Sequence, residues 1–351
     1  MPADAREARL LLRHLDGFSA KAPLVVLPPD AIIGPGVSDR LGGVPVTCFT
    51  TDWAVHRQSA DDGTARSLFA AWYDPSPAQH DAAIVFLPRG KAHAAMTLAM
   101  TARAVRPGAT VWVLGEIRSG IKSAPPLVAE HLGPVATSES GSHAVLLKAA
   151  RDSRTAPERG LADWAVTYPC PVGDRVLKAA SLPGVFSHGE LDAGTALLLG
   201  ELDPPQGAAV LDFGCGSGVL GAALRLTRPD CTVTLADASA LALAATRMTL
   251  AANGLSDDGV VPCDVFEGLE GTWDLIVSNP PFHDGVATDT RVTEAFIAAA
   301  RDRLNPGGRL HLVANRFLKY LPLLAKTFKR VKVTKQTTVY RVIEATRGPK
   351  R

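Results

Sequence analysis

Residues 278–283 read S-N-P-P-F-H, a combination of residue types that could hold and activate a small group. They follow W-D-L-I-V at 273–277, a short apolar run typical of a buried strand. Two consecutive prolines lack backbone N–H groups and have φ fixed at about −65°, so the chain must leave the sheet stiffly. We therefore predict a rigid binding corner at the carboxyl end of this strand, with Asn279, Pro280 and Phe282 as its catalytic residues.

The acceptors in this corner suit an amino group attached to an aromatic ring or an amide. Such an amine is a poor nucleophile because its lone pair is delocalised. The side-chain oxygen of Asn279 and the carbonyl of Pro280 can accept hydrogen bonds from it, which localises the lone pair and orients the nitrogen. Phe282 offers a face for a flipped base, and His283, with Asp284, could contact the substrate and carry a proton away. The alternative is a turn that only ends a strand.

A second group of residues predicts a cofactor site. Residues 210–220 read V-L-D-F-G-C-G-S-G-V-L, with three glycines between a predicted strand and a predicted helix, and Asp237 ends the next strand. Glycines permit close backbone approach to a ligand, and an acid at that place holds ribose hydroxyls. The spacing to Gly221 leaves a nicotinamide cofactor open. Asp212 instead favours a cationic ligand over a pyrophosphate, which it would repel. The predicted cofactor contacts are Asp212, Gly214, Gly216, Gly218, Asp237 and Asn279.

The elements that must position these residues alternate along the second half of the chain. Apolar runs typical of strands and segments of helical spacing succeed one another, which predicts a doubly wound, mostly parallel sheet of the α/β class. The helix at 241–253 is expected to end at Asn253-Gly254. The final segment, 331–345, alternates like two strands with almost no connection, so at least one pairs antiparallel. The expected strands are 208–213, 232–237, 273–278 and 309–314, and the helices are 219–226, 241–253 and 290–304.

The first half repeats this plan without its chemistry. D-A-A-I-V-F-L-P at 81–88 parallels W-D-L-I-V-S-N-P at 273–280, and a helix, a Pro-Gly turn and a strand follow both. We infer two similar domains, 1–155 and 156–351, joined by the polar segment near 150–165. V-V-L-P-P-D-A replaces the glycine run in the first, so this domain is expected to be degenerate. Its segments 34–37 and 89–91 could be a weak phosphate loop, although turn chemistry is favoured.

Composition and charge narrow the class of protein. The chain has 351 residues, 46% hydrophobic and 21% charged, without an apolar run long enough for a membrane span. Its amino terminus lacks the apolar segment of a signal peptide, and five dispersed cysteines suit reduced thiols, so we expect a cytoplasmic protein without metal. The net charge is only +2, but residues 316–351 carry eleven Lys or Arg and one acid. This tail is either a solvated face or a surface for phosphates.

Four motifs resemble those of RsmC-like guanine-N2 methyltransferases of small-subunit (16S) ribosomal RNA, in the class I S-adenosylmethionine-dependent superfamily. They are L-P-G-V-F-S-H-G-E-L-D-A-G-T-A-L-L-L at 182–199, the glycine run, S-N-P-P-F-H-D-G, and V-A-N-R-F-L-K-Y at 313–320; G-E-I-R-S-G-I-K-S-A at 115–124 is similar to the family's first half. The resemblance implies two tandem Rossmann-like methyltransferase domains, of which only the second binds S-adenosyl-L-methionine. It also implies that Asp264 meets the adenine amine, that Asp192 and Thr195 close the methionine pocket, and that the first domain supports RNA recognition.

The resemblance makes ribosomal RNA or the small ribosomal subunit the expected partner, and we expect the chain to be a monomer. The basic tail then becomes an RNA surface, with substrate contacts expected from Arg316, Lys319, Lys329, Arg330 and Lys332. Three alternatives stay open. The first is the sister enzyme acting on a large-subunit guanine. The second is a protein-glutamine or adenine-N6 methyltransferase, which shares N-P-P-[FY]. The third is a non-catalytic assembly factor that has kept a cofactor pocket.

Overall fold

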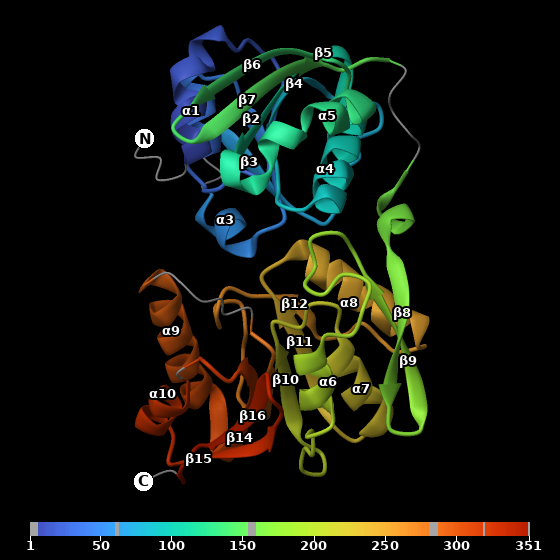
Figure 1. The fold of residues 1–351 in the computed structure, drawn as a ribbon, viewed down its shortest axis with the longest axis vertical. Coiled ribbons are helices and arrows are strands. Elements are labelled where there is room, and N and C mark those ends of the chain that lie inside the picture. The colour runs from blue at the N-terminus through green and yellow to red at the C-terminus, as the bar shows by residue number, and fades with distance from the viewer. Residues whose placement is uncertain (1–5, 60–62, 154–158, 281–286, 319, 350–351) are drawn as a thin grey trace. The chain divides into compact units, whose positions relative to one another are not determined.

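The computed structural model describes residues 6–59, 63–153, 159–280, 287–318 and 320–349, with the backbone alone for 287–294. The chain divides into an N-terminal unit, Met1–Trp164, and a C-terminal unit, Ala165–Arg351. Each unit contains a seven-stranded sheet with helices on both faces (Figure 1). The mixed α/β class and the pair of doubly wound, mostly parallel sheets predicted from the alternating segments are confirmed.

The N-terminal unit has the strand order β3-β2-β1-β4-β5-β7-β6. Helices α1 and α2 cover one face of this sheet, and α4 and α5 cover the other, with a hydrophobic core on each side. The strands are β1 (Pro23–Val26), β2 (Val46–Thr50), β3 (Ala65–Phe69), β4 (His80–Phe86), β5 (Val105–Glu116), β6 (Val135–Gly141) and β7 (Ala144–Ala150). The α-helices are α1 (Arg6–His14), α2 (Ile33–Arg40), α3 (Trp53–Gln58), α4 (Lys91–Ala104) and α5 (Pro125–His131).

The C-terminal unit repeats this order as β12-β11-β10-β13-β14-β16-β15. Its strands are β10 (Ala209–Phe213), β11 (Thr232–Asp237), β12 (Val260–Pro262), β13 (Trp273–Ser278), β14 (Leu304–Asn315), β15 (Arg330–Gln336) and β16 (Tyr340–Thr346). Its α-helices are α6 (Ala193–Leu199), α7 (Val219–Thr227), α8 (Ala240–Ala252), α9 (Ala287–Arg303) and α10 (Tyr320–Thr327). As predicted for the last two strands, β16 pairs antiparallel with both β14 and β15.

The helices of the C-terminal unit lie in two layers. Figure 1 shows α9 and α10 on one side of the sheet and α6, α7 and α8 on the other. Helix α8 begins after Ser239, whose hydroxyl accepts the N–H of Ala242, and Gly254 follows it with φ of +67°. That ending confirms the helix stop predicted at Asn253-Gly254, because a left-handed residue satisfies carbonyls at a helix end.

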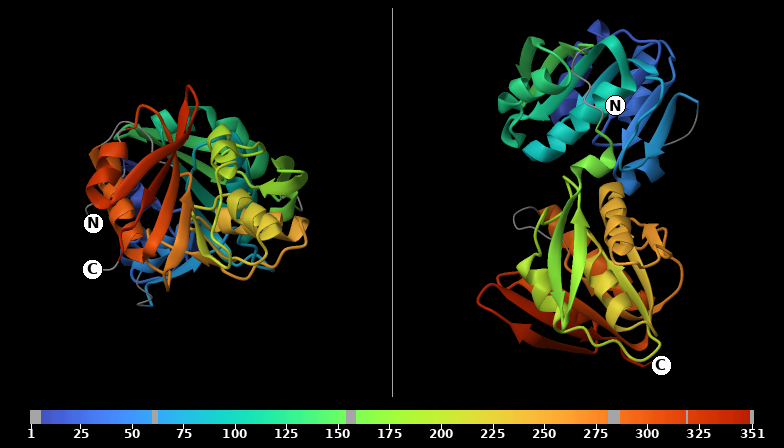
Figure 2. Two further views of the ribbon diagram at one scale, coloured as in Figure 1. Left: turned by 90° about the horizontal axis from the view of Figure 1, so that it is seen from below. Right: turned by 90° about the vertical axis from the view of Figure 1, so that its right-hand side faces the viewer.

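Two features differ from the prediction. Strands β8 (Val166–Val172) and β9 (Arg175–Ser181) form a separate two-stranded sheet, which packs on α8 and is drawn as the light green ribbon in Figure 2. This pair of strands was not predicted. The two Pro-Gly pairs are not turns between elements, because they lie inside β5 and β14, where Gly108 and Gly307 have φ of +80°. Register shifts in both strands mark the irregularity that these residues cause.

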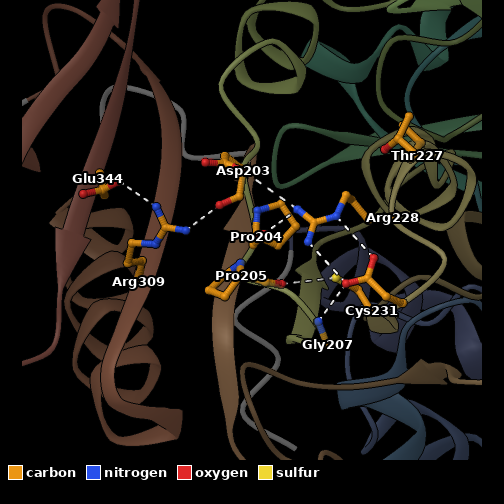
Figure 3. Close-up of polar contacts among 11 residues, drawn as sticks. Asp203, Pro204, Pro205, Gly207, Thr227, Arg228, Cys231, Arg309 and Glu344 are labelled. Atoms are coloured by element: carbon orange, nitrogen blue, oxygen red, sulfur yellow. Dashed lines mark hydrogen bonds and ion pairs between the residues drawn. The ribbon is translucent and has the colours of Figure 1, made fainter.

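A set of polar contacts holds the segment between α6 and β10 at the end of the sheet opposite to Asn315, the last residue of β14. Arg309 of β14 donates to the carbonyl of Asp203 and to Glu344, and Arg228 donates to the carbonyl of Pro204 (Figure 3). The segment follows α6, whose amino-terminal end lies in the cavity described below. Because these contacts hold the segment that directly follows α6, they help to fix α6 against the sheet.

The two sheets can be superposed strand by strand from their registers. Val85 pairs with Val113 in the first sheet, and Ser278 pairs with Leu312 in the second. Val113 and Leu312 occupy the same place in the twelve-residue strands β5 and β14, so Val85 corresponds to Ser278. Phe86, a buried ring, therefore stands where Asn279 stands in the C-terminal unit.

Candidate active site

A cavity of about 400 Å³ opens at the carboxyl ends of β10, β11 and β13. Strand β10 lies between β11 and β13, so the chain reverses its winding direction here, which is where doubly wound folds bind ligands. Every predicted cofactor residue except Gly218 lines this cavity. The lining residues include Asp192, Thr195, Asp212, Gly214, Gly216, Asp237, Asp264, Asn279 and Pro280.

The glycine run forms a tight loop between β10 and α7. Gly216 has φ of +56°, and a Cβ built on it would meet no atom within 4 Å, so the loop presents bare backbone to open space. Gly218 has a different role, because a Cβ there would lie 2.9 Å from the side chain of Thr246. One glycine thus leaves room for a ligand, and the other permits α8 to approach the loop.

Asp237 connects this loop to the end of β11. Its carboxylate accepts the N–H of Gly216 at 2.9 Å and the N–H of Ser239 at 2.9 Å. Burial raises the pKa of Asp237 above its ordinary value, although both N–H groups act in the opposite direction. The carboxylate therefore holds the glycine loop and the start of α8 in place, while it also lines the cavity.

Asp212 is buried beneath the same loop, with 1% of its surface exposed. Its carboxylate accepts the N–H of Gly221 in the first turn of α7 at 2.8 Å. Burial raises the pKa of Asp212 to about 7; the Gly221 hydrogen bond lowers it and the charge of Asp237 raises it. Asp212 therefore has a structural contact with α7 in addition to its place at the cavity wall.

Two buried threonines of α8 hold the glycine loop from behind. Thr246 Oγ1 donates to the carbonyl of Gly216 at 3.0 Å, and Thr249 Oγ1 donates to the carbonyl of Ser217 at 2.7 Å. Thr249 Oγ1 also accepts the N–H of Ala180 in β9 at 2.9 Å, which ties the two-stranded sheet to the loop. Sequence reasoning missed both residues, although two threonines three positions apart in an Ala/Leu-rich helix were the available signal.

Asn279 follows β13 directly, and its amide is held by residues at the start of α6. Asn279 Nδ2 donates to Asp192 Oδ2 and to Thr195 Oγ1, both at 2.8 Å. A carboxylate oxygen can only accept, so the amide nitrogen must face Asp192. Both amide hydrogens are therefore used, and the amide oxygen is the atom left to accept a hydrogen bond from another molecule.

Asp192 has a second task at this place. It is the N-cap residue of α6, and its Oδ2 accepts the N–H of Thr195 at 2.7 Å. The same carboxylate oxygen thus caps the helix and orients Asn279. Sequence reasoning expected Asp192 and Thr195 at the cofactor pocket, and the structure places them at its wall with a direct contact to the predicted catalytic asparagine.

Several predicted residues lie outside the part of the chain that the structure describes. These are Phe282, His283 and Lys319, together with Pro281 and Asp284. Pro280 is described and lines the cavity beside Asn279. Ser278, the residue before them, donates its hydroxyl to the carbonyl of Phe213 at 2.7 Å, which links the ends of β13 and β10.

The structure separates the residues of the predicted RNA surface. Arg316 is exposed and follows the carboxyl end of β14, close to the end of β13. Lys329 precedes β15, and Arg330 is its first residue. Arg330 and Arg309 both lie beside Thr346 of β16, so Arg330 is at the end of the strands opposite to Arg316. Lys332 is in the same strand and forms an ion pair with Glu344 at 3.0 Å. These cations do not make one surface around the cavity.

Two other residues accompany Arg316 beyond the carboxyl end of β14, the half-buried Arg341 and the exposed Phe317. Arg316 N–H donates to the carbonyl of Val339, and Arg341 donates to the carbonyl of Arg316. Phe317 is 63% exposed, which is unusual for a phenyl ring with so much apolar surface. The pair of arginines and the exposed ring were not recognised together from the sequence, because Arg341 is distant along the chain.

No helix among the described residues is both long and apolar enough to cross a membrane. Within the same residues, no group of three or more His, Cys, Asp or Glu side chains has an arrangement that could hold a metal ion.

Comparison with known proteins covers nearly the whole chain. Residues 8–168 match the family described as methyltransferase small domain N-terminal, and residues 176–344 match methyltransferase small domain. Ribosomal RNA small subunit methyltransferase C of Pseudoalteromonas atlantica is 39% identical over 340 residues, 95% of this chain and 97% of its own length. The protein of that name from Pseudomonas aeruginosa is 41% identical over 344 residues, 97% of this chain and 99% of its own length.

A solved structure is similar over the same extent. The T. thermophilus 16S rRNA N2 G1207 methyltransferase, in complex with AdoMet and guanosine, has a TM-score of 0.83 and 27% identity to this chain. The similarity covers 98% of this chain and 92% of that one. The resemblance recognised in the motifs is therefore confirmed, and the chain belongs to the ribosomal RNA small subunit methyltransferase C family.

Proposed function

We propose that this chain transfers a methyl group from S-adenosyl-L-methionine to the exocyclic N2 amine of a guanine in small-subunit ribosomal RNA. The observation that carries the proposal is the fixed amide of Asn279, which points its acceptor away from Asp192 and Thr195. An acceptor beside a cofactor cavity suits a substrate that donates N–H groups. The names of the relatives and the guanosine in the T. thermophilus complex support this substrate class.

The residues of the cavity fit S-adenosylmethionine. A volume of about 400 Å³ lies within the ordinary range of small-molecule sites. The open space beside Gly216 would receive the methionine part, Asp237 the ribose hydroxyls and Asp264 the adenine amine. The carboxylates at the wall suit a ligand with a sulfonium and an ammonium charge and no phosphate. When bound, this cofactor supplies the methyl group on a sulfonium.

The chain's own part in the reaction is to position an unreactive amine. Asn279 Oδ1 and the carbonyl of Pro280 would each accept one N–H of the guanine amine, which directs the nitrogen lone pair toward the methyl group. Asp192 and Thr195 keep the amide from rotating, so the acceptor is in place before the substrate arrives. The negative charge of Asp192, close to Asn279, would also stabilise the positive charge that develops on the nitrogen.

RNA would approach at the edge formed by the exposed Arg316 and Phe317 together with the half-buried Arg341. This edge follows the end of β14, next to the strand that ends in Asn279. Arginines bind phosphates, and an exposed ring can stack on an unpaired base. The target guanine must leave its helix to reach a cavity, because base edges are poorly accessible in A-form duplexes.

The substitution Asn279→Ala tests this function. It should reduce kcat by about 100-fold or more, since it removes a preorganised group that contacts the reacting amine. The cofactor Kd, measured by calorimetry, should change by no more than about threefold. Full activity of the variant on small-subunit RNA would refute the role of the amide. If the unmodified enzyme transferred the methyl group to a protein glutamine or to adenine, guanine would be refuted as the substrate.

A further inference from the structure

The first turn of α6 has contacts besides those with the predicted catalytic asparagine. Asp192 Oδ2 and Thr195 Oγ1 accept the amide hydrogens of Asn279, and α6 also packs on β14 and β16. Gly194 lies between the two acceptors in the sequence and is buried in this packing. The neighbours of Gly194 therefore help to decide where both acceptors stand.

The ring of Tyr340 lies directly against Gly194. A Cβ built on Gly194 would lie 3.3 Å from Cδ1 and Cε1 of that ring and 3.0 Å from Asp192 Oδ2. Carbon atoms in contact normally lie about 3.5–4.0 Å apart, so a side chain here would displace the ring or the carboxylate. Gly194 has a helical backbone, which any residue can adopt, and alanine favours a helix more than glycine does. Packing, and not backbone conformation, therefore favours glycine at this position.

Tyr340 is itself held in a fixed place. It is the first residue of β16, which lies between β14 and β15 in the sheet, and it pairs with Asn315. Its N–H donates to Thr337 Oγ1 at 2.9 Å, and its carbonyl accepts the N–H of Thr337 at 2.8 Å. The half-buried ring thus rests on an inner strand of the sheet and gives α6 a rigid support.

This support acts at the carboxylate that orients Asn279. The position of the missing Cβ is next to both the ring and Asp192 Oδ2, so the ring covers one side of the carboxylate's surroundings. A ring in this place limits movement of the first turn of α6. It also keeps out water, which would compete with the amide of Asn279 for Oδ2.

We infer that Gly194 and Tyr340 are positioning residues for the methyl transfer. Tyr340 supports the first turn of α6, and Gly194 leaves room for its ring. Asp192 can then hold Asn279 in one orientation. Neither Gly194 nor Tyr340 lines the cavity, so each acts through Asp192. The inference rests on the proposed function, because that function makes the orientation of the amide matter.

The substitution Gly194→Ala tests the inference, with Gly200→Ala as its matched control. Gly200 follows the same helix with φ of −70°, and a Cβ there would come no closer than 3.7 Å to its neighbours. Gly194→Ala should lower kcat by about tenfold, because the amide loses its orientation, whereas the control should keep its kcat. The cofactor Kd should change by no more than about threefold in both. Tyr340→Ala should also lower kcat, and Tyr340→Phe, which keeps the ring, should recover it.

A double substitution separates positioning from a general loss of structure. In a protein that already carries Asp192→Ser, Gly194→Ala should lower kcat by less than about twofold, because the contact that it disturbs is gone. Equal losses with and without Asp192→Ser would overturn the inference. So would an unchanged kcat in Gly194→Ala, or an equal loss in Gly200→Ala.

The side-chain amide of Asn279 gives a further measurement that needs no substrate. Heteronuclear NMR spectra of isotope-labelled protein show this group, and its signal is identified by its absence in Asn279→Ala. Its hydrogens should exchange with water faster in Gly194→Ala than in the unmodified protein or in Gly200→Ala. Equal exchange in the two glycine variants would overturn the inference. If the unmodified enzyme methylates no guanine, the proposed function fails, and this signal still decides the positioning role.

Discussion

The side chain of Asn279 illustrates how neighbours can decide the role of one residue. An amide carries an acceptor and a donor of similar size, and either end could face a substrate. Asp192 removes the ambiguity, because its carboxylate accepts the amide N–H, and Thr195 takes the second hydrogen. The atom of the amide that is left for another molecule is therefore an acceptor. The sequence motif alone could not establish this, since Asp192 lies far away along the chain.

Substitutions of Asp192 and Thr195 should reveal their positioning role. Asp192→Ser keeps an N-cap for α6 but is too short to reach Asn279, and Thr195→Val removes the other acceptor. Each should lower kcat by about 10-fold, since a loosened amide loses orientation. Asp192→Asn and Thr195→Ser retain an oxygen and should recover most of the activity. Steady-state kinetics and thermal melting separate this effect from instability, because equal melting losses in all four variants would show a structural role only.

The buried carboxyl group of Asp212 should make stability depend on pH. Its pKa is about 7 in the folded chain, whereas an unfolded Asp titrates near 4, so the folded state binds the extra proton between these values. Stability should therefore fall as pH rises from about 4 to 7, by at most about 1.4 kcal/mol per pH unit. Asp212→Asn keeps the shape of the side chain but has no titrating carboxyl group. The melting temperature of this variant should therefore fall less between pH 4 and 7 than that of the unmodified protein. Parallel melting curves from pH 5 to 8 would contradict the account.

Among the elements, α8 fixes the shape of the cofactor site from behind the glycine loop. It presents Thr246 and Thr249 to the glycine loop from behind and Ser239 to the end of β11. Its side chains replace hydrogen bonds that a tight, glycine-rich loop cannot make with itself. The loop is thus held from behind by two threonines of a helix whose first turn, with Ser239 and Ala242, also lines the cavity.

Removing one of these hydroxyl groups should loosen the loop. Thr249→Val leaves the Ser217 carbonyl and the Ala180 N–H without their partner in a buried place, at a cost of about 1–3 kcal/mol. Cofactor Kd should rise, and kcat at saturating cofactor should change little. Thr249→Ser keeps the hydroxyl and serves as the control. Calorimetry that gave the same Kd for valine and serine variants would show that the loop does not depend on α8.

Sequence reasoning located the ends of elements better than the contacts between them. Glycines, prolines and strand-terminal acids carry local conformational information, and Gly216, Asp237 and Asn279, which such signals single out, line one cavity. The threonines of α8 escaped notice because their role depends on packing against a distant loop. One interpretation of the basic tail was a single RNA surface. However, the antiparallel pairing of β14, β16 and β15 places Arg316 and Arg330 at opposite ends of these strands.

At the scale of the whole molecule, one strand order carries two different sets of residues at its carboxyl edge. Both units have the same strand order, but only the C-terminal one keeps the glycine loop and the asparagine. Function therefore depends on a few positions at the carboxyl edge of each sheet, and not on the architecture. In the N-terminal unit, Leu27 N–H donates to the carbonyl of Phe49, as Gly214 N–H does to that of Ala236, so Leu27 stands where the glycine loop begins. Phe86 stands at the place of the asparagine.

Binding of RNA should depend on salt through Arg316 and Arg341, near the carboxyl end of β14. The double variant Arg316→Gln and Arg341→Gln should weaken RNA binding and flatten the salt dependence of log K by about 1.5–2, because each arginine would neutralise one phosphate. The cofactor Kd should stay the same, since neither residue lines the cavity. Filter binding at several salt concentrations gives both quantities. A parallel loss of cofactor binding would point to a damaged fold.

The central claim is that the rigid corner after β13 presents the N2 amine of a guanine to a bound methyl donor. Mass spectrometry of small-subunit RNA tests it most directly, after incubation of the purified protein with cofactor carrying a deuterated methyl group. We predict labelled N2-methylguanosine at a single site with the unmodified protein, and loss of the label with Asn279→Ala. Label on adenine, on protein, or on guanine with undiminished yield in the alanine variant would contradict the claim.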